Sequence, residues 1–374
     1  MKVITVTGTR PELIRLSVIL KKLDEVCEHI HVYTNQNYDP NLRDIFLKEL
    51  GIRQPDYMLP KTTTGEFLGQ CFLEFDKILE KEKPDKMLVL GDTNSALTAI
   101  LAAKKGIPVY HMEAGNRCYD GDVPEETNRR VVDACSLFNL PYTENSKQNL
   151  INERFHKNFV FKTGNPIKEV LENYFDQIEE SYILSRLGLQ LPMPVGGDVV
   201  QKYAVLTFHR TENVDNKRRS EAVVAAVNKI SETMPVVYSF HPRTRDQFAK
   251  HGIEFAPNVI LTDPIGFFDF VKLEKNAALV ITDSGTVPEE TSLFNVPTIV
   301  LRNTTERQEL MENGTLILAG TRYEDIMRAF NTVSEMKQPW AGLEDYDKIN
   351  VSDTVVRLLL GQNTKFARHG HDEY

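Results

Sequence analysis

The sequence has few of the features that mark membrane-spanning, secreted or metal-binding proteins. No apolar run among its 374 residues approaches the ~20 residues that a membrane-spanning helix needs. The four cysteines show no CxxC or other metal-ligand spacing, so we expect free thiols in a reducing cytoplasm and no metal site. The chain begins directly on an apolar run that predicts a strand, and we therefore expect no signal peptide. These absences favour a cytoplasmic protein without a membrane partner.

Two further absences bear on the kind of ligand. The net charge is −9, so the chain lacks the basic surface that nucleic-acid backbones require, and we expect no nucleic-acid partner. The first turn between a predicted strand and a helix reads GTRPE (8–12) and not GxGxxG, which gives no support to a bound nicotinamide cofactor. A protein with a net negative charge can still bind a small anionic ligand if a few Arg and His side chains are concentrated in a cleft.

Short apolar runs alternate with longer helical patterns from end to end, which predicts parallel sheets with helices on both faces. The first half is expected to hold helices at 13–23, 64–79 and 95–105, and strands at 3–7, 31–34, 86–90, 109–112, 137–140 and 159–161. The second half is expected to hold strands at 204–208, 236–240, 258–261, 278–282 and 298–301. The fold class is therefore α/β, with two Rossmann-like halves of similar size.

The organisation predicts a first domain over 1–168 and a second over 169–350, with a ligand cleft between them. A long charged helix is expected at 166–187, and LPMPVGGD (191–198) has the Pro and Gly content of a linker or domain-joining loop. A final helix is expected at 351–360, and the last eleven residues resemble a frayed tail.

Five junctions between a strand and a helix carry chemically active residues. At the first, Arg10 is placed beside a helix N-terminus, where free N–H groups favour a phosphate, or else it pairs with Glu12. At the second, GDTNSA, Asp92 is either a carboxylate held at a strand end or the N-cap of the next helix.

The third junction lies within HMEAGNRCYDGDVPEETNRR, where Glu113 directly follows a strand and is a candidate site acid. Glu125 and Glu126 fall in a first helical turn, where acids complement the helix dipole. They can also pair at i,i+4 with Arg129 and Arg130. Only one of the two glutamates can easily face a cleft, and the other is expected to support its helix.

The fourth junction carries His209 and Arg210, and the next α/β unit repeats the pattern with His241 in HPRTR. A histidine at such a strand end is a candidate acid or phosphate ligand, although lone histidines are usually structural. The nearby run NKRRS (216–220) is interpreted as a solvated helix face.

The fifth junction, ITDSGTVPEE, has the most specific local pattern in the chain. The hydroxyls and N–H groups of Ser284, Gly285 and Thr286 suit a diphosphate at a helix start. Glu290 lies one turn further on, where an acid can accept both hydroxyls of a ribose. Arg307 follows the next strand and can reach the same ligand, and the alternative is an ordinary capped helix between two strands.

Taken in order, GTRPE, GDT, EAGNR, PEETNRR, HR, DSG, PEE and TTER resemble the non-hydrolysing UDP-N-acetylglucosamine 2-epimerase family. The resemblance runs from Gly8 to about Gly314. It implies the GT-B architecture, two Rossmann-like domains with the active site between them, and a C-terminal helix (about 351–374) that returns to the first domain. It also implies a homodimer and a reaction without a cofactor.

The reaction implied by this resemblance removes the C2 proton of the sugar while UDP leaves C1, giving a 2-acetamidoglycal, and re-addition inverts C2. The resemblance assigns acid/base roles to Asp92, Glu113 and Glu125, and assistance of the leaving UDP to His209. The residues implied to bind UDP or its phosphates are Arg10, His241, Ser284, Gly285, Thr286, Glu290 and Arg307.

The chain also departs from the family pattern, because QNYD (36–39) stands where a Gln-His-Arg run is usual and EAGNRCYD replaces EAGLRT. The first departure puts regulation by a second UDP-GlcNAc in doubt. With VPEETNRR, these segments resemble the branch acting on UDP-N-acetyl-6-deoxy-L-hexosamines, of the L-fucosamine or the L-quinovosamine/L-rhamnosamine series, for polysaccharide or glycan synthesis. The alternatives are a UDP-GlcNAc/UDP-ManNAc 2-epimerase, a GT-B glycosyltransferase and a non-catalytic nucleotide-sugar sensor.

Overall fold

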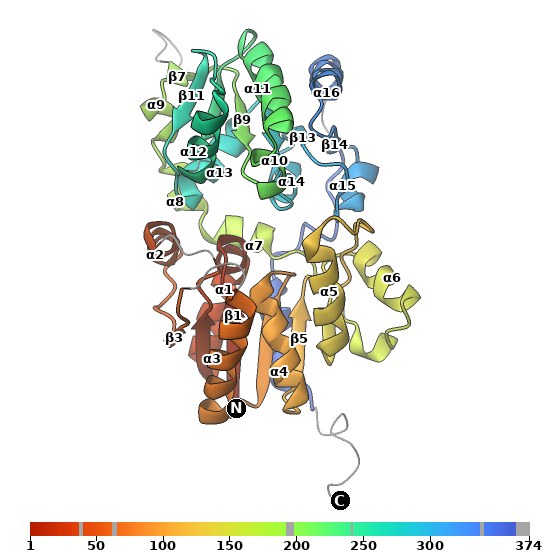
Figure 1. The fold of residues 1–374 in the computed structure, drawn as a ribbon. Coiled ribbons are helices and arrows are strands. Elements are labelled where there is room, and N and C mark those ends of the chain that lie inside the picture. The colour runs from red at the N-terminus through yellow and green to blue at the C-terminus, as the bar shows by residue number, and fades with distance from the viewer. Residues whose placement is uncertain (37–39, 62–65, 192–197, 241, 337–339, 364–374) are drawn as a thin grey trace, which may run out of the picture. The chain divides into compact units, whose positions relative to one another are not determined.

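The chain divides into two compact units, each described by itself below (Figure 1). The computed structural model describes residues 1–36, 40–61, 66–191, 198–240, 242–336 and 340–363. Unit 1 comprises Met1–Asn173 with Glu344–Tyr374, and unit 2 comprises Tyr174–Leu343. The predicted boundaries at 168 and 351 therefore require correction. Helix α7 (Ile167–Asn173) packs on α1 (Arg10–Val26), and the Ser352 backbone N–H donates to Glu169 Oε2 at 2.8 Å.

Unit 1 is built on a six-stranded parallel sheet in the order β3-β2-β1-β4-β5-β6. The order reverses between β1 and β4, as in the Rossmann fold. The prediction of a strand at 159–161 is wrong, because this region holds a 3-10 turn and a single isolated bridge. The strands are β1 (Lys2–Thr7), β2 (Glu28–Tyr33), β3 (Tyr57–Met58), β4 (Lys86–Leu90), β5 (Val109–Met112) and β6 (Phe138–Leu140).

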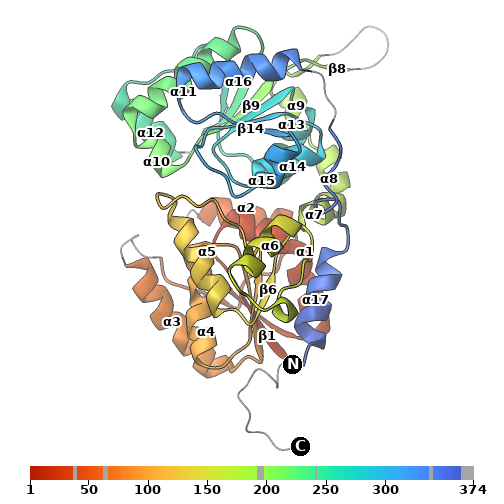
Figure 2. The same cartoon turned by 90° about the vertical axis from the view of Figure 1, so that its right-hand side faces the viewer.

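Helices cover both faces of this sheet, which explains why its central strands β1 and β4 are buried along almost their whole length. On one face lie α3 (Phe67–Glu82), α4 (Ala99–Lys104) and α5 (Pro124–Cys135), and on the other lie α1 and α17 (Val351–Gly361) (Figure 2). The predicted helix at 95–105 is split into η1 (Asn94–Thr98) and α4. The other helices of unit 1 are α2 (Pro40–Glu49), α6 (Glu144–Asn152) and η2 (Lys157–Phe159).

The C-terminal helix α17 packs alongside α1. Lys22 of α1 donates to Asp353 of α17 at 2.5 Å. The Lys86 ammonium donates to the backbone oxygens of Leu359 and Gln362 at 2.6 and 2.7 Å. A cation at these carbonyls also complements the negative end of the helix dipole. The last described helix is therefore an integral part of unit 1.

Unit 2 repeats the same topology, with six parallel strands in the order β11-β10-β9-β12-β13-β14. One face is covered by α10 (Thr211–Val214), α11 (Lys217–Ser231), α12 (Pro242–His251) and α16 (Tyr323–Glu335). The other is covered by α9 (Ile183–Arg186), α13 (Phe267–Asn276) and α14 (Val287–Leu293). The strands are β9 (Ala204–Thr207), β10 (Val236–Ser239), β11 (Val259–Thr262), β12 (Leu279–Thr282), β13 (Thr298–Val300) and β14 (Leu316–Leu318).

Two predictions about the middle of the chain are corrected. The helix expected over 166–187 is three short helices, α7, α8 (Phe175–Glu179) and α9. The segment read as a linker joins β7 (Gln190–Leu191) to β8 (Val199–Val200), which pair antiparallel within unit 2. Residues 192–197, like the tail 364–374, lie outside the described residues. Helix α15 (Gln308–Glu312) completes unit 2.

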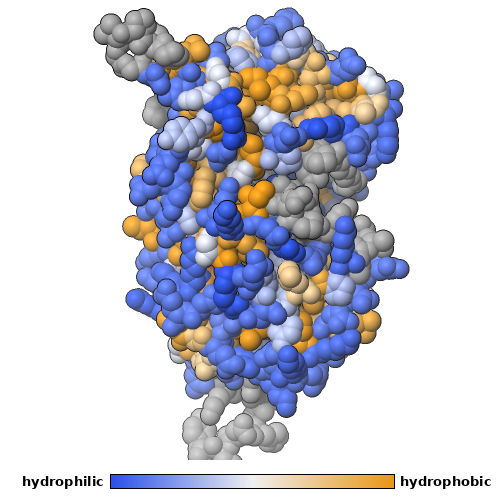
Figure 3. Space-filling model, turned by 90° about the vertical axis from the view of Figure 1, so that its left-hand side faces the viewer, coloured by the Kyte–Doolittle hydropathy of each residue, from blue (hydrophilic) through white to orange (hydrophobic). Residues whose placement is uncertain are grey.

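On the face drawn in Figure 3, apolar side chains lie in several groups separated by hydrophilic ones. No helix in the described part of the chain is both long enough and apolar enough to cross a membrane. All four cysteines are free thiols, as predicted.

Candidate active site

In each unit, two of the polar turns identified in the sequence follow the two strands at which the strand order reverses, whereas the turn that carries Glu113 follows β5 in unit 1. In unit 1 the two strands are β1, which leads into Gly8–Arg10, and β4, which leads into Gly91–Thr93. In unit 2 they are β9, which leads into His209–Arg210, and β12, which leads into Asp283–Thr286. Open α/β sheets bind ligands outside the carboxyl ends of their strands at such reversal points. Each unit therefore has its own candidate ligand-binding edge.

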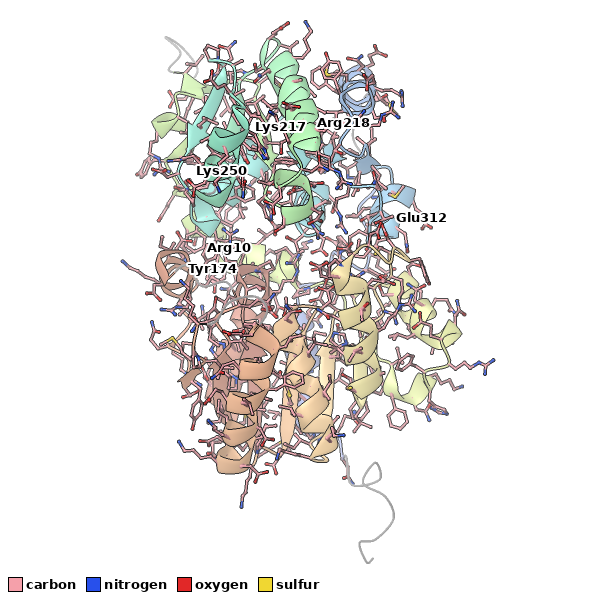
Figure 4. All side chains as sticks on the ribbon, in the orientation of Figure 1. Arg10, Tyr174, Lys217, Arg218, Lys250 and Glu312 are labelled. Carbon is pink, nitrogen blue, oxygen red and sulfur yellow. The ribbon has the colours of Figure 1, made fainter. Side chains whose placement is uncertain are left out.

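At the first edge, Glu12 fastens the turn after β1 to the turn after β4. Its Oε2 accepts from the backbone N–H groups of Gly8 and Thr9, both at 2.7 Å, and its Oε1 accepts from Thr93 Oγ1 at 2.7 Å. Burial raises the pKa of Glu12 to about 7, although the hydrogen bonds from Thr93, Gly8 and Thr9 lower it. The expected free N–H groups at this helix start are thus partly taken by Glu12. The Arg10 guanidinium, which lies over the Phe46 ring, remains the anion contact proposed there (Figure 4).

Asp92 follows β4 and is held by α5. Its Oδ2 accepts from Arg129 Nε at 2.9 Å and forms an ion pair with Arg129 Nη2 at 2.6 Å. Asn128 of the same helix donates to the Asp92 backbone oxygen at 2.9 Å. Asp92 is not the N-cap of the next helix, because η1 begins after Thr93. Its carboxylate is therefore oriented by the PEETNRR helix.

Glu113 and the turn that carries Asp92 lie close together. A Cβ built on Gly91 would lie 3.3 Å from Glu113 Oε2, and Gly91 has φ +71°. The backbone of Glu113 is itself in the left-handed region, with φ +67°. Such a conformation costs a non-glycine residue about 1–3 kcal/mol and is concentrated at functional sites. Asn116 Nδ2 donates to Glu113 Oε1 at 3.1 Å.

A buried network of polar side chains holds these two turns in place. His111 Nδ1 lies 2.8 Å from Asp133 Oδ1, and its Nε2 lies 2.8 Å from the Gly91 oxygen. Arg117 pairs with Asp133 at 2.8 Å, and the Gly115 N–H points at both Asp133 oxygens at 3.3 Å. Since His111, Arg117 and Asp133 are almost fully buried, the network fixes the positions of the strand ends.

The structure separates the two adjacent glutamates of α5. Glu126 is buried and accepts from the Cys118 N–H at 3.0 Å, from Arg129 at 3.2 Å and from Arg130 at 2.9 Å. Glu125 is half-buried, and its buried Oε2 has no hydrogen-bond partner among the described residues. Arg129, expected to pair with Glu125, pairs with Asp92 and Glu126. Glu126 is therefore the structural glutamate, and Glu125 has a carboxylate oxygen available.

In unit 2, Asp283 connects the turn after β9 to the turn after β12. It is fully buried and accepts from the N–H groups of His209 at 3.1 Å and Arg210 at 2.8 Å, and from Asn213 Nδ2 at 3.3 Å. His209 Nδ1 lies 3.4 Å from Asp283 Oδ1, and the imidazole keeps 46% of its surface exposed. The histidine is thus anchored by its backbone while its ring stays accessible.

The DSGT turn is closely packed against the TTER segment. Ser284 Oγ accepts from the Thr286 N–H at 3.2 Å, which shapes the turn before α14. A Cβ on Gly285 would lie 2.4 Å from Glu306 Oε1, so a larger residue there would have to displace the Glu306 carboxylate. Arg302 and Glu306 form a buried ion pair at 2.9 Å beside it. Ser284, Gly285 and Thr286 remain partly exposed.

The other two predicted contacts of this edge are buried. Arg307 forms an ion pair with the fully buried Glu289 through its Nε. Glu290 is 5% exposed and has a buried acidic neighbour, Glu274. Burial, and secondarily the charge of Glu290, raises the pKa of Glu274 well above its ordinary value. Ligand contacts by Arg307 and Glu290 remain predictions.

Several residues that organise these edges were missed by sequence reasoning. Arg129, Asn116 and Asp283 make these contacts across 3 to 74 residues of chain, and although all three stand in the motifs EAGNR, PEETNRR and DSG, their partners were not predicted. His241 lies outside the described residues. Of the run at 216–220 that was predicted as a solvated helix face, Lys217 and Arg218 are exposed at the start of α11, whereas Ser220 is fully buried (Figure 4).

Two parallel α/β units with the same strand order, each with polar turns at its reversal point, define the GT-B class of folds. A family model described as UDP-N-acetylglucosamine 2-epimerase matches residues 21–360. A UDP-N-acetylglucosamine 2-epimerase from Methanocaldococcus jannaschii is 37% identical over 370 residues, covering 96% of this chain and 99% of the relative. The chain belongs to the UDP-N-acetylglucosamine 2-epimerase family, whose members are isomerases.

Two further comparisons cover most of the chain. A UDP-2,3-diacetamido-2,3-dideoxy-D-glucuronate 2-epimerase from Pseudomonas aeruginosa is 34% identical over 338 residues, covering 89% of this chain and 92% of the relative. The crystal structure of the Methanocaldococcus jannaschii UDP-GlcNAc 2-epimerase with UDP-GlcNAc and UDP has a TM-score of 0.89 at 35% identity. That match covers 97% of this chain and 100% of the other. The expected fold class is thereby confirmed.

Proposed function

We propose that the protein inverts C2 of a UDP-N-acetylhexosamine by eliminating UDP and adding it back. A base takes the C2 proton as the C1–O bond to UDP breaks, which leaves a 2-acetamidoglycal and UDP. A proton then returns to the other face of C2, and the UDP oxygen re-forms the bond to C1. No electrons are transferred to a carrier, so the reaction requires no redox cofactor.

The observation that carries this proposal is the placement of Asp92 and Glu113 on adjoining turns, with Glu113 Oε2 close to the Gly91 backbone. Inverting a C–H centre requires a group that removes a proton on one face and a group that supplies one on the other. Glu125, with a buried carboxylate oxygen lacking a partner among the described residues, is the third candidate. We assign acid/base chemistry to these three carboxylates.

Unit 2 is proposed to hold the nucleotide. The hydroxyls and N–H groups of Ser284, Gly285 and Thr286 suit a diphosphate, and the exposed His209 ring can donate to the departing UDP oxygen. Arg10 of unit 1 is the further phosphate contact. We also retain Glu290 as the acceptor of ribose hydroxyls, Arg307 as a further UDP contact and a homodimeric assembly as proposals.

For the substrate, we propose a UDP-N-acetyl-6-deoxy-L-hexosamine. The support is the sequence of the Glu113 turn, EAGNRC, together with VPEETNRR and QNYD, of which residues 37–39 lie outside the described part of the chain. UDP-GlcNAc is the second candidate, because relatives of 33–37% identity carry the name UDP-N-acetylglucosamine 2-epimerase. In the structure, Asn116 and Cys118 of the EAGNRC turn contact Glu113 and Glu126.

The test incubates the protein in D2O with a panel of UDP-N-acetylhexosamines that includes both classes. The proposal expects deuterium at C2 of the product, detected by NMR, together with traces of free UDP. A product without C2 deuterium contradicts the elimination mechanism, and UDP release that depends on an added sugar acceptor indicates a glycosyltransferase. Tight binding without turnover of any epimer indicates a nucleotide-sugar sensor.

A further inference from the structure

We propose that Asn116 is a positioning residue that fixes the orientation and charge state of the Glu113 carboxylate. The inference rests on the proposed function, in which Glu113 acts as an acid or base. Asn116 has 4% of its surface exposed, so it acts on the reaction through Glu113 and not through the sugar. Its amide nitrogen donates to Glu113 Oε1 at 3.1 Å.

A directed chain of hydrogen bonds sets the orientation of the Asn116 amide. Thr143 Oγ1 accepts from the Ser146 N–H and donates to Ser146 Oγ, both at 3.1 Å. Ser146 Oγ must then give its own proton to Asn116 Oδ1, which lies 2.8 Å away. With its oxygen engaged by Ser146, the Asn116 amide can only present its NH2 group to Glu113.

The backbone immediately before Asn116, at Gly115, lies tightly against α6. A Cβ on Gly115 would lie 2.2 Å from the Ser146 backbone oxygen, and Gly115 has φ +79°. Asn149 of α6 donates to the Gly115 oxygen at 3.0 Å. Because the helix and the turn are in such close contact, the Asn116 side chain has no room to move away from Glu113.

The charged groups around this turn engage mainly one another. They are the buried His111, Arg117 and Asp133 with the half-buried Glu153, the Asp92–Arg129 pair, and Glu126 with Arg129 and Arg130. Asn116 contributes an uncharged donor within this set. A donor to Glu113 Oε1 favours the ionised form of this carboxylate, whose Oε2 lies on the side of Gly91.

The test compares the pH profiles of C2–H exchange for the wild type, N116L and S146A. Leucine has a similar size but no donor, so the N116L profile is expected to move to higher pH by about one unit. We expect kcat at neutral pH to fall about tenfold with little change in KM, because the nucleotide contacts are untouched. S146A, which frees the amide to rotate, is expected to give a smaller shift in the same direction.

The matched control is N152L, the same substitution at an exposed asparagine of α6, and it should keep the wild-type profile. Profiles of N116L and S146A that superimpose on the wild type would overturn the inference, as would an equal shift in N152L. If N116L fails to fold, the pH profile of S146A alone is compared with that of the wild type. If the wild type exchanges no C2 proton, the proposed function fails separately. The Asn116 contact is then judged by carbon-13 NMR titration of Glu113, assigned with E113Q, in wild type against S146A.

Discussion

The buried Glu12 carboxyl gives a quantitative prediction for E12Q. Glu12 is 1% exposed, and burial raises its pKa from 4.5 to about 7 despite four hydrogen bonds to its oxygens. The folded state therefore binds a proton that the unfolded state releases, and stability falls as pH rises from 4.5 to about 7. Each pKa unit corresponds to about 1.4 kcal/mol, so ionisation of Glu12 lowers the free energy of unfolding by about 3 kcal/mol between these two pH values. A glutamine keeps one acceptor oxygen for the Gly8 and Thr9 N–H groups, can donate its NH2 group to Thr93 Oγ1, and has no charge to bury.

The assay is urea unfolding of the wild type and E12Q between pH 4.5 and 8, followed by two signals. Far-UV circular dichroism reports both units. The single tryptophan, Trp340, donates to the Ser292 oxygen within unit 2, so its fluorescence reports unit 2 alone. Between low and high pH, the free energy of unfolding of E12Q should rise by about 3 kcal/mol relative to that of the wild type. This change should appear in the circular dichroism transition and not in the tryptophan fluorescence.

The control for this measurement is E25Q, on an exposed position of the same helix, which should follow the wild-type pH dependence. Parallel stability curves for E12Q and the wild type would refute the reasoning, because they would mean that Glu12 is no harder to ionise in the folded state. A pH-dependent change confined to the Trp340 signal would refute it as well.

Three further predictions concern the turns and their ion pairs. G115A places a Cβ 2.2 Å from a backbone oxygen, so we expect at least a tenfold loss of C2–H exchange and a lower melting temperature, measured by NMR and calorimetry. R307M leaves the buried Glu289 without its cation and should destabilise unit 2 by about 3–5 kcal/mol in tryptophan-detected unfolding; unchanged stability would contradict the ion pair. E125Q should abolish exchange at a wild-type melting temperature, whereas E126Q should lower the melting temperature. The opposite pair of results would mean that Glu126 is the acid/base residue and Glu125 the structural one.

The strands and their polar ends could be predicted from the sequence because both are local properties. Alternating apolar and helical runs located ten of the twelve strands of the two parallel sheets, and missed β3 and β14. Strand β3 has two residues, which is too short for a periodic signal, whereas β14 has three residues, as many as the located strands β6 and β13. The long helix expected over 166–187 failed for a different reason, since charged helical composition says little about where a helix breaks.

The candidate residues were found for the same local reason, because acids and histidines directly after buried strands are visible in the chain. Their partners were not visible. Arg129 was expected to pair with its helical neighbour Glu125, and it contacts Asp92, 37 residues away. The N–H groups at the start of α1 were expected to be free for an anion, and Glu12 accepts from two of them.

The sequence by itself therefore determined the α/β class, the placement of polar turns at strand ends and the family resemblance. Only the tertiary structure decided which glutamate of α5 is structural, which residues brace Asp92 and Glu113, and that Asp283 joins the turns of unit 2. The physical reason is the range of the interactions. Strand and helix patterns arise from sterics and burial within a few residues, whereas a hydrogen-bond partner depends on which distant elements the packed sheet brings together.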